Sequence, residues 1–222
     1  MSRDKDWDNA FTATGLYGTV KGSPSYAGAL SFMRRKYTRD LAGVDVAVTG
    51  IPLDLATTNR PGARFGPRAI RAATPGISWA RPWPWDFDPF DRLAVVDYGD
   101  CEFDPGEPDT VVPFIQKHIA KILDGGAASL VLGGDHFVTY PVLKAYAAHH
   151  GPLSLIHFDA HSDTWSEKTR RLDHGTMFYH AVRDGLVADS RSVQIGLRTT
   201  NDEPMGFNIL DARWVHQKGP AA

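Results

Sequence analysis

Short apolar runs and longer segments with helical spacing follow one another along most of the chain. The runs that predict buried strands cover residues 44–49, 93–97, 128–132, 153–158 and 192–197. Apolar residues recur every three or four positions in residues 110–123, 138–148 and 175–186, which predicts helices there. Pro67 is expected in the first turn of a further helix. This alternation predicts an α/β fold with three layers, in which helices cover both faces of a mainly parallel sheet.

Two segments show neither pattern. Residues 1–40 contain many Gly, Ser and Thr residues, and we expect an irregular N-terminal arm there. Residues 79–90, with the sequence WARPWPWDFDPF, are too rich in proline for a helix or a central strand. Such a rigid aromatic loop is expected to pack as a lid or as a subunit contact. We see no linker between the remaining elements, so residues 1–222 are expected to form a single domain.

Composition narrows the class of protein. The chain has 222 residues, of which 42% are hydrophobic, enough for a sizeable core. A net charge of −2 gives no electrostatic reason to expect binding to nucleic acid or to an anionic membrane. There is no apolar run of transmembrane length and no signal segment. The single cysteine, Cys101, excludes an internal disulfide and is expected to be a structural thiol, so we expect a cytoplasmic location.

The segment at residues 153–165, LSLIHFDAHSDTW, changes character in its middle. The apolar strand is followed by Asp159, His161 and Asp163 at alternate positions. If the backbone stays extended, these three side chains point the same way. Neighbouring carboxylates repel each other, and a divalent cation bound by carboxylate oxygen and imidazole nitrogen removes that repulsion. A polar loop that caps the next helix is the alternative, but this spacing directly after a buried strand favours a metal site.

His136 follows the preceding predicted strand, in the sequence Gly133-Gly134-Asp135-His136. The two glycines allow a tight turn at the carboxyl end of that strand. Ligands of parallel sheets bind at this end, so we expect His136 to project toward the same crevice as Asp159. A lone histidine at such a position is more often structural, and it is the neighbouring D-x-H-x-D segment that makes His136 a candidate ligand.

His174 begins the next predicted helix, between Asp173 and Gly175. Imidazole titrates near neutral pH, so His174 is a candidate general acid or base. The alternative is that Asp173 caps the helix and His174 is exposed. His157 lies within the strand and is expected to be a core residue or a neighbour of the ligands. Three arginines of the loop at residues 57–71, Arg60, Arg64 and Arg68, are candidate ligand contacts or intersubunit salt-bridge partners, and the structural role is favoured.

Four motifs together resemble the ureohydrolase family, also called the arginase/agmatinase family. They are GGDHFVTYPVL, SLIHFDAHSDTW, LDHGTMFYHA and SVQIGLRT, and the segments PGARFGPRAIR and PWPWDFD are also similar to those of bacterial agmatinases. The resemblance runs from about residue 44 to about residue 212. It implies a three-layer α/β/α fold with a two-manganese site, and it is the resemblance that selects manganese over other metals. A deacetylase with the same architecture is disfavoured, because the GGDH and DHGTMF segments fit ureohydrolases better.

The resemblance also implies a role for each candidate residue. His136 and Asp163 would bind one manganese, His161 would bind the other, and Asp159 would bridge them. His174 matches the family histidine that moves protons to the leaving amine or to solvent. Metal-activated hydroxide would attack the guanidinium carbon and give urea and an amine.

The substrate is inferred from one local difference within the family. Residues 166–172, SEKTRRL, lack the Asn with which arginases hold the amino acid end of arginine. This favours agmatine, which would give putrescine and urea and place the protein in polyamine metabolism. Guanidinobutyrate or another guanidino acid is the alternative substrate. By family resemblance we expect a homo-oligomer, a trimer or a hexamer.

The match to the family is incomplete in one respect. A later Asp-x-Asp motif supplies two further metal ligands in the family, but no such motif follows His174, and Asp202 and Glu203 are adjacent. One metal would keep three side-chain ligands and the other only Asp159 and His161. We therefore expect a C-terminally truncated family member that binds at most one metal firmly and turns over poorly. The alternative is a non-catalytic family member that acts only in assembly.

Overall fold

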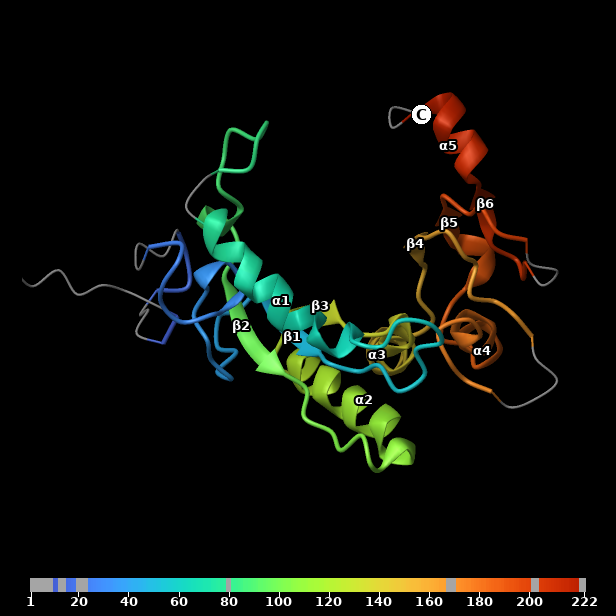
Figure 1. Ribbon diagram of the computed structural model, residues 1–222, viewed down its shortest axis with the longest axis horizontal. Coiled ribbons are helices and arrows are strands. Elements are labelled where there is room, and N and C mark those ends of the chain that lie inside the picture. The colour runs from blue at the N-terminus through green and yellow to red at the C-terminus, as the bar shows by residue number, and fades with distance from the viewer. Residues whose placement is uncertain are drawn as a thin grey trace, which may run out of the picture. The chain divides into compact units, whose positions relative to one another are not determined.

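In a computed structural model of the chain, the described residues are 10–11, 15–18, 24–78, 81–166, 171–200 and 204–219. The chain divides into two compact units, Met1–Asp135 and His136–Ala222. Each unit contains one three-stranded sheet, and every strand pairing is parallel (Figure 1). Several predictions fall wholly or partly outside the described residues, among them parts of the N-terminal arm, Trp79, and the pair Asp202 and Glu203.

The sheet of the first unit has the strand order β2-β1-β3. Its strands are β1 (Val46–Ile51), β2 (Val95–Asp100) and β3 (Ala128–Gly133). All three lie within a few residues of the predicted apolar runs. The central strand β1 is buried at every position except the first, as expected for a parallel strand covered on both faces.

Two helices, α1 (Gly66–Ala73) and α2 (Pro108–Asp124), cover this sheet. On β1, the hydroxyl of Thr49 contacts His118 of α2, and the next residue, Gly50, lies directly against Pro67 of α1. Adjacent residues of a strand point to opposite faces, so the two helices cover opposite sides of the sheet (Figure 1). Both helices were predicted, and Pro67 lies in the first turn of α1 as expected.

The described part of the N-terminal arm is held by a buried arginine. The guanidinium of Arg35 donates to the backbone carbonyls of Leu16, Gly18 and Val95, and it lies 4.3 Å from the ring centroid of Phe90. Within these described residues the arm contains one 3-10 turn, η1 (Phe32–Arg34). The other 3-10 turns of the described chain are η2 (Ala63–Phe65), η3 (Thr74–Gly76), η4 (Pro89–Asp91), η5 (His136–Val138) and η6 (Asp189–Arg191).

The second unit has shorter strands, in the order β4-β5-β6. Its strands are β4 (Ile156–Phe158), β5 (Val193–Ile195) and β6 (Asn208–Leu210), and its helices are α3 (Thr139–His150), α4 (Met177–Arg183) and α5 (Ala212–Lys218). The sequence did not predict β6 or α5. β6 has only three residues, and only two of them are apolar, which is too short a run to indicate a strand.

The burial of β4 contradicts the prediction. Ile156 and Phe158 were expected to be buried, but they are 67% and 74% exposed, whereas His157 between them is 5% exposed. The cause is that α4 packs on the His157 face of the strand, where the ring centroids of His157 and Phe178 lie 4.7 Å apart. The apolar run therefore predicted the strand correctly and its buried face incorrectly.

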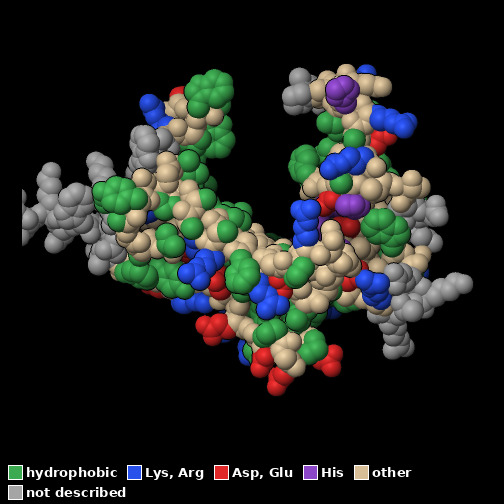
Figure 2. All heavy atoms as spheres, in the orientation of Figure 1, with side chains coloured by type: hydrophobic (Ala, Val, Ile, Leu, Met, Phe, Trp, Pro, Cys, Tyr) green, Lys and Arg blue, Asp and Glu red, His purple; other side chains and the backbone are tan. Residues whose placement is uncertain are grey.

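The described surface shows a group of acidic side chains. Acidic side chains gather around the start of α2 (Figure 2), where Glu102, Asp104, Glu107 and Asp109 are exposed. Negative charge at this position is favourable because the N-terminus of a helix carries a partial positive charge. Among the described residues, no helix combines the length and apolar character needed to cross a membrane.

Candidate metal centre

Four side chains of the second unit converge at the end of β4. They are His136, His157, Asp159 and Asp163, and one nitrogen or oxygen atom of each lies within 4.8 Å of the others. His136 begins the turn η5, His157 lies on β4, and Asp159 directly follows that strand. Parallel α/β sheets commonly bind ligands at this end of their strands.

The distances within the group are short enough for one ion to contact several members. Nδ1 of His136 lies 3.0 Å from Oδ2 of Asp163 and 3.6 Å from Oδ2 of Asp159. Nε2 of His157 lies 3.5 Å from the same oxygen of Asp159. His136 and Asp159 are partly exposed, so the group is open to solvent on one side, whereas His157 and Asp163 are buried.

His161 lies on the other side of Asp159. Its Nδ1 is 3.5 Å from Oδ1 of Asp159, and its ring is largely exposed. The backbone N–H of His161 also donates to Oδ1 at 2.9 Å. The two carboxylate oxygens of Asp159 thus face different histidines, with His136 near Oδ2 and His161 near Oδ1.

The backbone conformation that brings these side chains together differs from the prediction. An extended chain was expected to align Asp159, His161 and Asp163, but the strand ends at Phe158 and Asp163 has a φ of 54°. This left-handed conformation is tolerated by Asp better than by most residues. A turn in the loop, and not strand alternation, brings Asp163 beside His136.

The electrostatics of the group favour the protonation states that bind cations. Burial raises the pKa of Asp159, but the backbone N–H of His161 and the nearby His157 and His136 outweigh it, so the pKa lies below its ordinary value. Burial, together with the charge of His136, lowers the pKa of His157. Ionised carboxylates and neutral imidazoles are the forms that coordinate metals.

The donor atoms fit a divalent cation. The ion pairs that the structure describes for Asp159 and Asp163 are all with histidines, so no permanent positive charge neutralises these carboxylates there. Nε2 of His157 is buried and has no hydrogen-bond partner in the described protein. Oxygen and imidazole donors together suit the borderline divalent metals, manganese among them.

The loop that carries His174 is joined to the loop of the acidic residues. The N–H of Trp165 donates to the carbonyl of Gly175 at 3.1 Å, and the N–H of Phe178 donates to the carbonyl of Asp163 at 3.0 Å. His174 is partly buried and directly precedes Gly175, where the first of these links ends. Asp173 does not cap α4, which begins after Thr176; its buried carboxylate instead accepts from the N–H of Gly175.

His157 is the one member of the four-residue group that sequence reasoning had not named as a candidate ligand. It had been predicted as a core residue or a neighbour of the ligands. A signal was present in the strand pattern, because His157 alternates with Ile156 and Phe158 and immediately precedes Asp159. Strand alternation placed it on a different face from the apolar residues, but only the position of α4 decided which face is buried.

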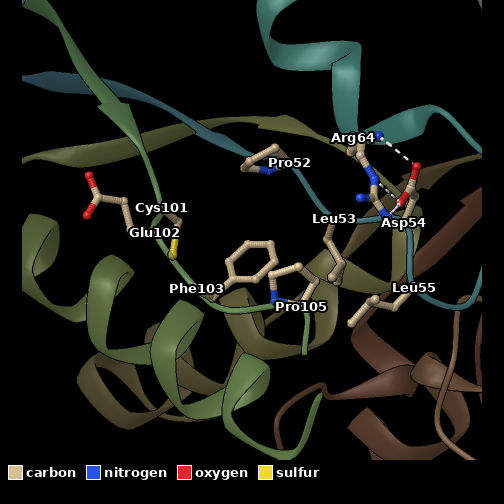
Figure 3. Close-up of a pocket in the computed structure, with 9 residues that line it drawn as sticks. All are labelled: Pro52, Leu53, Asp54, Leu55, Arg64, Cys101, Glu102, Phe103 and Pro105. Atoms are coloured by element: carbon tan, nitrogen blue, oxygen red, sulfur yellow. Dashed lines mark hydrogen bonds and ion pairs between the residues drawn. The ribbon is translucent and has the colours of Figure 1, made fainter. Parts of the chain in front are cut away.

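The first unit contains a cavity in which a buried carboxylate is paired with an arginine. A cavity of about 210 Å³ is lined by Pro52, Leu53, Asp54, Leu55, Arg64, Cys101, Glu102, Phe103 and Pro105 (Figure 3). The buried carboxylate of Asp54 accepts from the guanidinium of Arg64, and this contact lowers the pKa of Asp54. The sequence favoured an intersubunit salt bridge for Arg64, whereas the structure pairs Arg64 with Asp54 of the same chain.

Cys101, at the same cavity, is a buried thiol. Burial raises its pKa to about 11, so it is protonated at neutral pH. A protonated thiol is a poor nucleophile and a poor metal ligand. This agrees with the structural role predicted for it.

Comparison with known proteins identifies the family. A sequence profile described as "Arginase family" matches residues 44–222. The agmatinase of Chromobacterium violaceum is 57% identical over 214 residues, which cover 96% of this chain and 66% of that protein. The agmatinase of Proteus mirabilis is 47% identical over 176 residues, which cover 79% of this chain and 57% of that protein. The chain thus spans about two thirds or less of the length of these relatives.

Solved structures show the same relationship. The crystal structure of a hypothetical agmatinase from Burkholderia thailandensis matches with a TM-score of 0.91 and 57% identity, over 96% of this chain and 67% of the other. Proclavaminate amidino hydrolase from Streptomyces clavuligerus matches with a TM-score of 0.79 and 36% identity, over 89% of this chain and 68% of the other. The predicted α/β fold with parallel strands is confirmed, and the chain belongs to the arginase family.

Proposed function

We propose that this protein hydrolyses the guanidino group of agmatine to putrescine and urea. The observation that carries the proposal is the convergence of His136, His157, Asp159 and Asp163 in a chain that is 57% identical to an agmatinase. Agmatine is a guanidino amine without the α-carboxylate of arginine, so the enzyme needs no contact with an amino acid head group. Guanidinobutyrate or another guanidino acid is the alternative substrate.

The metal ligands in this proposal are His136, Asp159, His161 and Asp163. His136 and Asp163, whose ligand atoms lie 3.0 Å apart, would hold one ion. Asp159 and His161 would hold the other, since Oδ1 of Asp159 lies 3.5 Å from Nδ1 of His161. A divalent ion such as manganese supplies a bound water of lowered pKa, and thereby hydroxide at neutral pH. The protein's own contribution is the fixed geometry of the two aspartates and the histidines.

His174 is proposed to move the proton that the leaving amine requires. Imidazole is the side chain best suited to accept and donate protons at neutral pH. The backbone bonds from Trp165 to Gly175 and from Phe178 to Asp163 hold its loop beside the acidic loop. Replacement of His174 by Asn is expected to lower turnover about 100-fold or more without loss of metal.

The number of metals is also part of the proposal. The first ion has three side-chain ligands within the described group, whereas the second keeps Asp159 and His161. We therefore expect the 222-residue chain to bind one manganese ion firmly and a second one weakly, and to turn over slowly. The protein is expected to act in the cytoplasm as a homo-oligomer, a trimer or a hexamer by analogy with its family.

The test measures metal content and urea release on the same preparation. The purified chain is dialysed, loaded with Mn²⁺ and supplied with agmatine, arginine or guanidinobutyrate. Release of urea from agmatine in preference to the other two supports the proposal, and Asp163→Asn is expected to abolish it. The matched control is His216→Gln, a change at an exposed residue of α5.

Two outcomes contradict parts of this proposal. Preference for guanidinobutyrate would replace the substrate but keep the reaction. Metal binding without urea release from any of the three guanidines would favour the alternative, a family member that acts only in assembly. Two tightly bound ions and fast turnover would overturn the expectation of one firm site.

A further inference from the structure

The buried amide of Gln194 lies directly beside His157. The two residues are paired across β4 and β5, and Gln194 is fully buried. Nε2 of Gln194 donates to the backbone carbonyl of Ser162 at 2.7 Å and lies 3.2 Å from Nδ1 of His157. These two contacts determine where the imidazole of His157 carries its proton.

The orientation of the amide is fixed by Ser162. A backbone carbonyl can only accept, so the atom of Gln194 that lies 2.7 Å from it must be the NH₂ group. Rotating the amide by half a turn would place an acceptor against an acceptor inside the fold. The NH₂ group has two hydrogens, and the second one is directed to Nδ1 of His157.

It follows that Nδ1 of His157 is the acceptor and that Nε2 carries the proton. Nε2 is the atom that lies 3.5 Å from Oδ2 of Asp159, and within the described protein it has no hydrogen-bond partner. The edge of Phe178 packs against the ring, so the ring is held in place. His157 therefore presents an N–H group, not a lone pair, to the carboxylate.

A metal bond from His157 would require the opposite tautomer. Coordination through Nε2 needs a lone pair on that atom and a proton on Nδ1. That proton would meet the NH₂ group of Gln194, donor against donor, in a buried site where unmade hydrogen bonds are costly. The four-residue group thus contains three ligands and one donor.

We propose that Gln194 and His157 form a positioning pair that orients Asp159 toward the metal. Gln194 sets the tautomer of His157, so that the Nε2–H of His157 faces Oδ2 of Asp159 at 3.5 Å, and its partial positive charge favours one orientation of the carboxylate. This inference rests on the proposed metal site, since it assigns a role around that site. Neighbours that hydrogen-bond to metal ligands typically change metal affinity about 10–100-fold when they are replaced.

The first test measures the tautomer of His157 by NMR in the metal-free protein. Two-bond proton–nitrogen correlations of ¹⁵N-labelled protein are expected to show the His157 proton on Nε2. The same pattern is expected after addition of Zn²⁺, a diamagnetic stand-in for manganese, while the ring of His136 responds to the metal. A proton on Nδ1, or loss of the Nε2 proton on metal addition, would overturn the proposal.

The second test separates a donor from a ligand by substitution. In His157→Gln, the side-chain amide places an N–H near the former Nε2 but is a poor metal ligand. We expect His157→Gln to keep Mn²⁺ affinity within about threefold, and His157→Phe to lose about 10–100-fold, in a calorimetric titration. Equal losses in both variants, at the level of Asp163→Asn, would show that His157 is a ligand.

In a third variant, Gln194→Glu, the two roles of His157 predict changes in Mn²⁺ affinity of opposite sign. Gln194→Glu replaces the donor with a carboxylate, which accepts a proton from Nδ1 and turns the lone pair of Nε2 toward Asp159. If Gln194 and His157 position Asp159, the Gln194→Glu variant is expected to bind Mn²⁺ more weakly than the unaltered protein. If His157 were a ligand, the same carboxylate would raise its basicity and strengthen binding, so a gain in affinity contradicts the proposal.

The controls keep this inference separate from the proposed function. His216→Gln makes the same chemical change as His157→Gln at an exposed position of α5. Thermal melts identify any variant that fails to fold, and the tautomer of the unaltered protein then decides the question alone. Absence of urea release with the proton found on Nε2 would overturn the agmatine proposal and leave the tautomer assignment intact.

Discussion

The two units differ in which residues pair with their carboxylates. In the first unit, Asp97 is fully buried and accepts two hydrogen bonds from the guanidinium of Arg71, at 2.7 and 2.9 Å. In the second unit, the described ion pairs of Asp159 and Asp163 are with histidines only. Arginine is always charged, whereas the charge of a histidine depends on pH. One carboxylate is thus neutralised by the protein itself, and the other two are left for a cation.

The two sheets also differ, in how much of the central or leading strand is buried and in whether its polar atoms are hydrogen-bonded. In the first unit β1 is buried on both faces, and the polar hydroxyl of Thr49 on it is fully bonded. In the second unit β4 buries only His157, and two polar atoms there, Nε2 of His157 and Oε1 of Gln194, lack a partner in the described protein. A bonded hydroxyl such as that of Thr49 stabilises the fold, whereas the unbonded Nε2 of His157 lies 3.5 Å from Asp159, beside the proposed metal site.

The largest effect is expected where a permanent ion pair is broken. Asp97→Asn removes the negative charge from Arg71, which is left with only the partly exposed Asp100. We expect the free energy of unfolding to fall by about 3–5 kcal/mol, measured by urea denaturation, with no loss of Mn²⁺ affinity in the protein that remains folded. Asp124→Asn, at an exposed position, is the control and should change stability by less than about 0.5 kcal/mol. A loss below about 1 kcal/mol in Asp97→Asn would remove the contrast between the units.

The second effect should appear in metal affinity and not in stability. Asp163→Asn removes one of two neighbouring carboxylates, so metal-free protein is expected to be as stable as the unaltered protein or slightly more stable. Mn²⁺ affinity is expected to fall by more than about 100-fold, beyond the usual cost of replacing a neighbour of a ligand. Isothermal titration and thermal melts without metal measure the two quantities. Marked destabilisation of the metal-free protein would mean that Asp163 is paired structurally, like Asp97.

The third effect is a dependence of stability on pH, caused by His118 in the first unit. Burial, together with the charges of Arg39 and Lys121, lowers the pKa of His118 from 6.5 to about 4. Thr49 donates to the carbonyl of Gly99, so it accepts from the partly buried ring of His118, which is neutral at neutral pH. Between these two pH values the unfolded chain binds a proton that the folded chain does not, so stability falls as the pH is lowered.

The expected loss is about 2 kcal/mol between pH 6.5 and pH 4, reduced from the full shift because His118 is partly exposed. Urea denaturation at a series of pH values measures it. His118→Gln keeps a donor for Thr49 and does not titrate, so this contribution to the pH dependence should disappear. An unchanged slope in His118→Gln would show that other groups cause the acid sensitivity.

The smallest change in the free energy of unfolding is expected when one neutral hydrogen-bond donor near the end of β3 is removed. The hydroxyl of Thr57 donates to Oδ2 of Asp135 at 3.2 Å. Thr57→Val keeps the shape and removes the bond, and we expect a loss of about 1 kcal/mol in the free energy of unfolding. Thr57→Ser keeps the hydroxyl and is the matched control. Equal losses in both variants would assign the effect to the methyl group and its packing.

The sequence by itself determined most of the fold and the residue types of the site. Apolar periodicity located β1, β2, β3 and the helices α1 to α4 to within a few residues, because this signal is local. The motifs around His136 and Asp159 indicated a metal site through their chemistry, and the family likeness followed from the same segments.

Only the tertiary structure decided which atoms meet. The left-handed turn at Asp163, the burial of His157 by α4, the exposure of Phe158 and the pairing of Arg64 with Asp54 all depend on how distant segments pack. A strand pattern states that alternate residues face opposite sides, but it does not state which side a helix will cover. Convergence of a site depends on the path of a loop in space, and the sequence of that loop leaves several paths open.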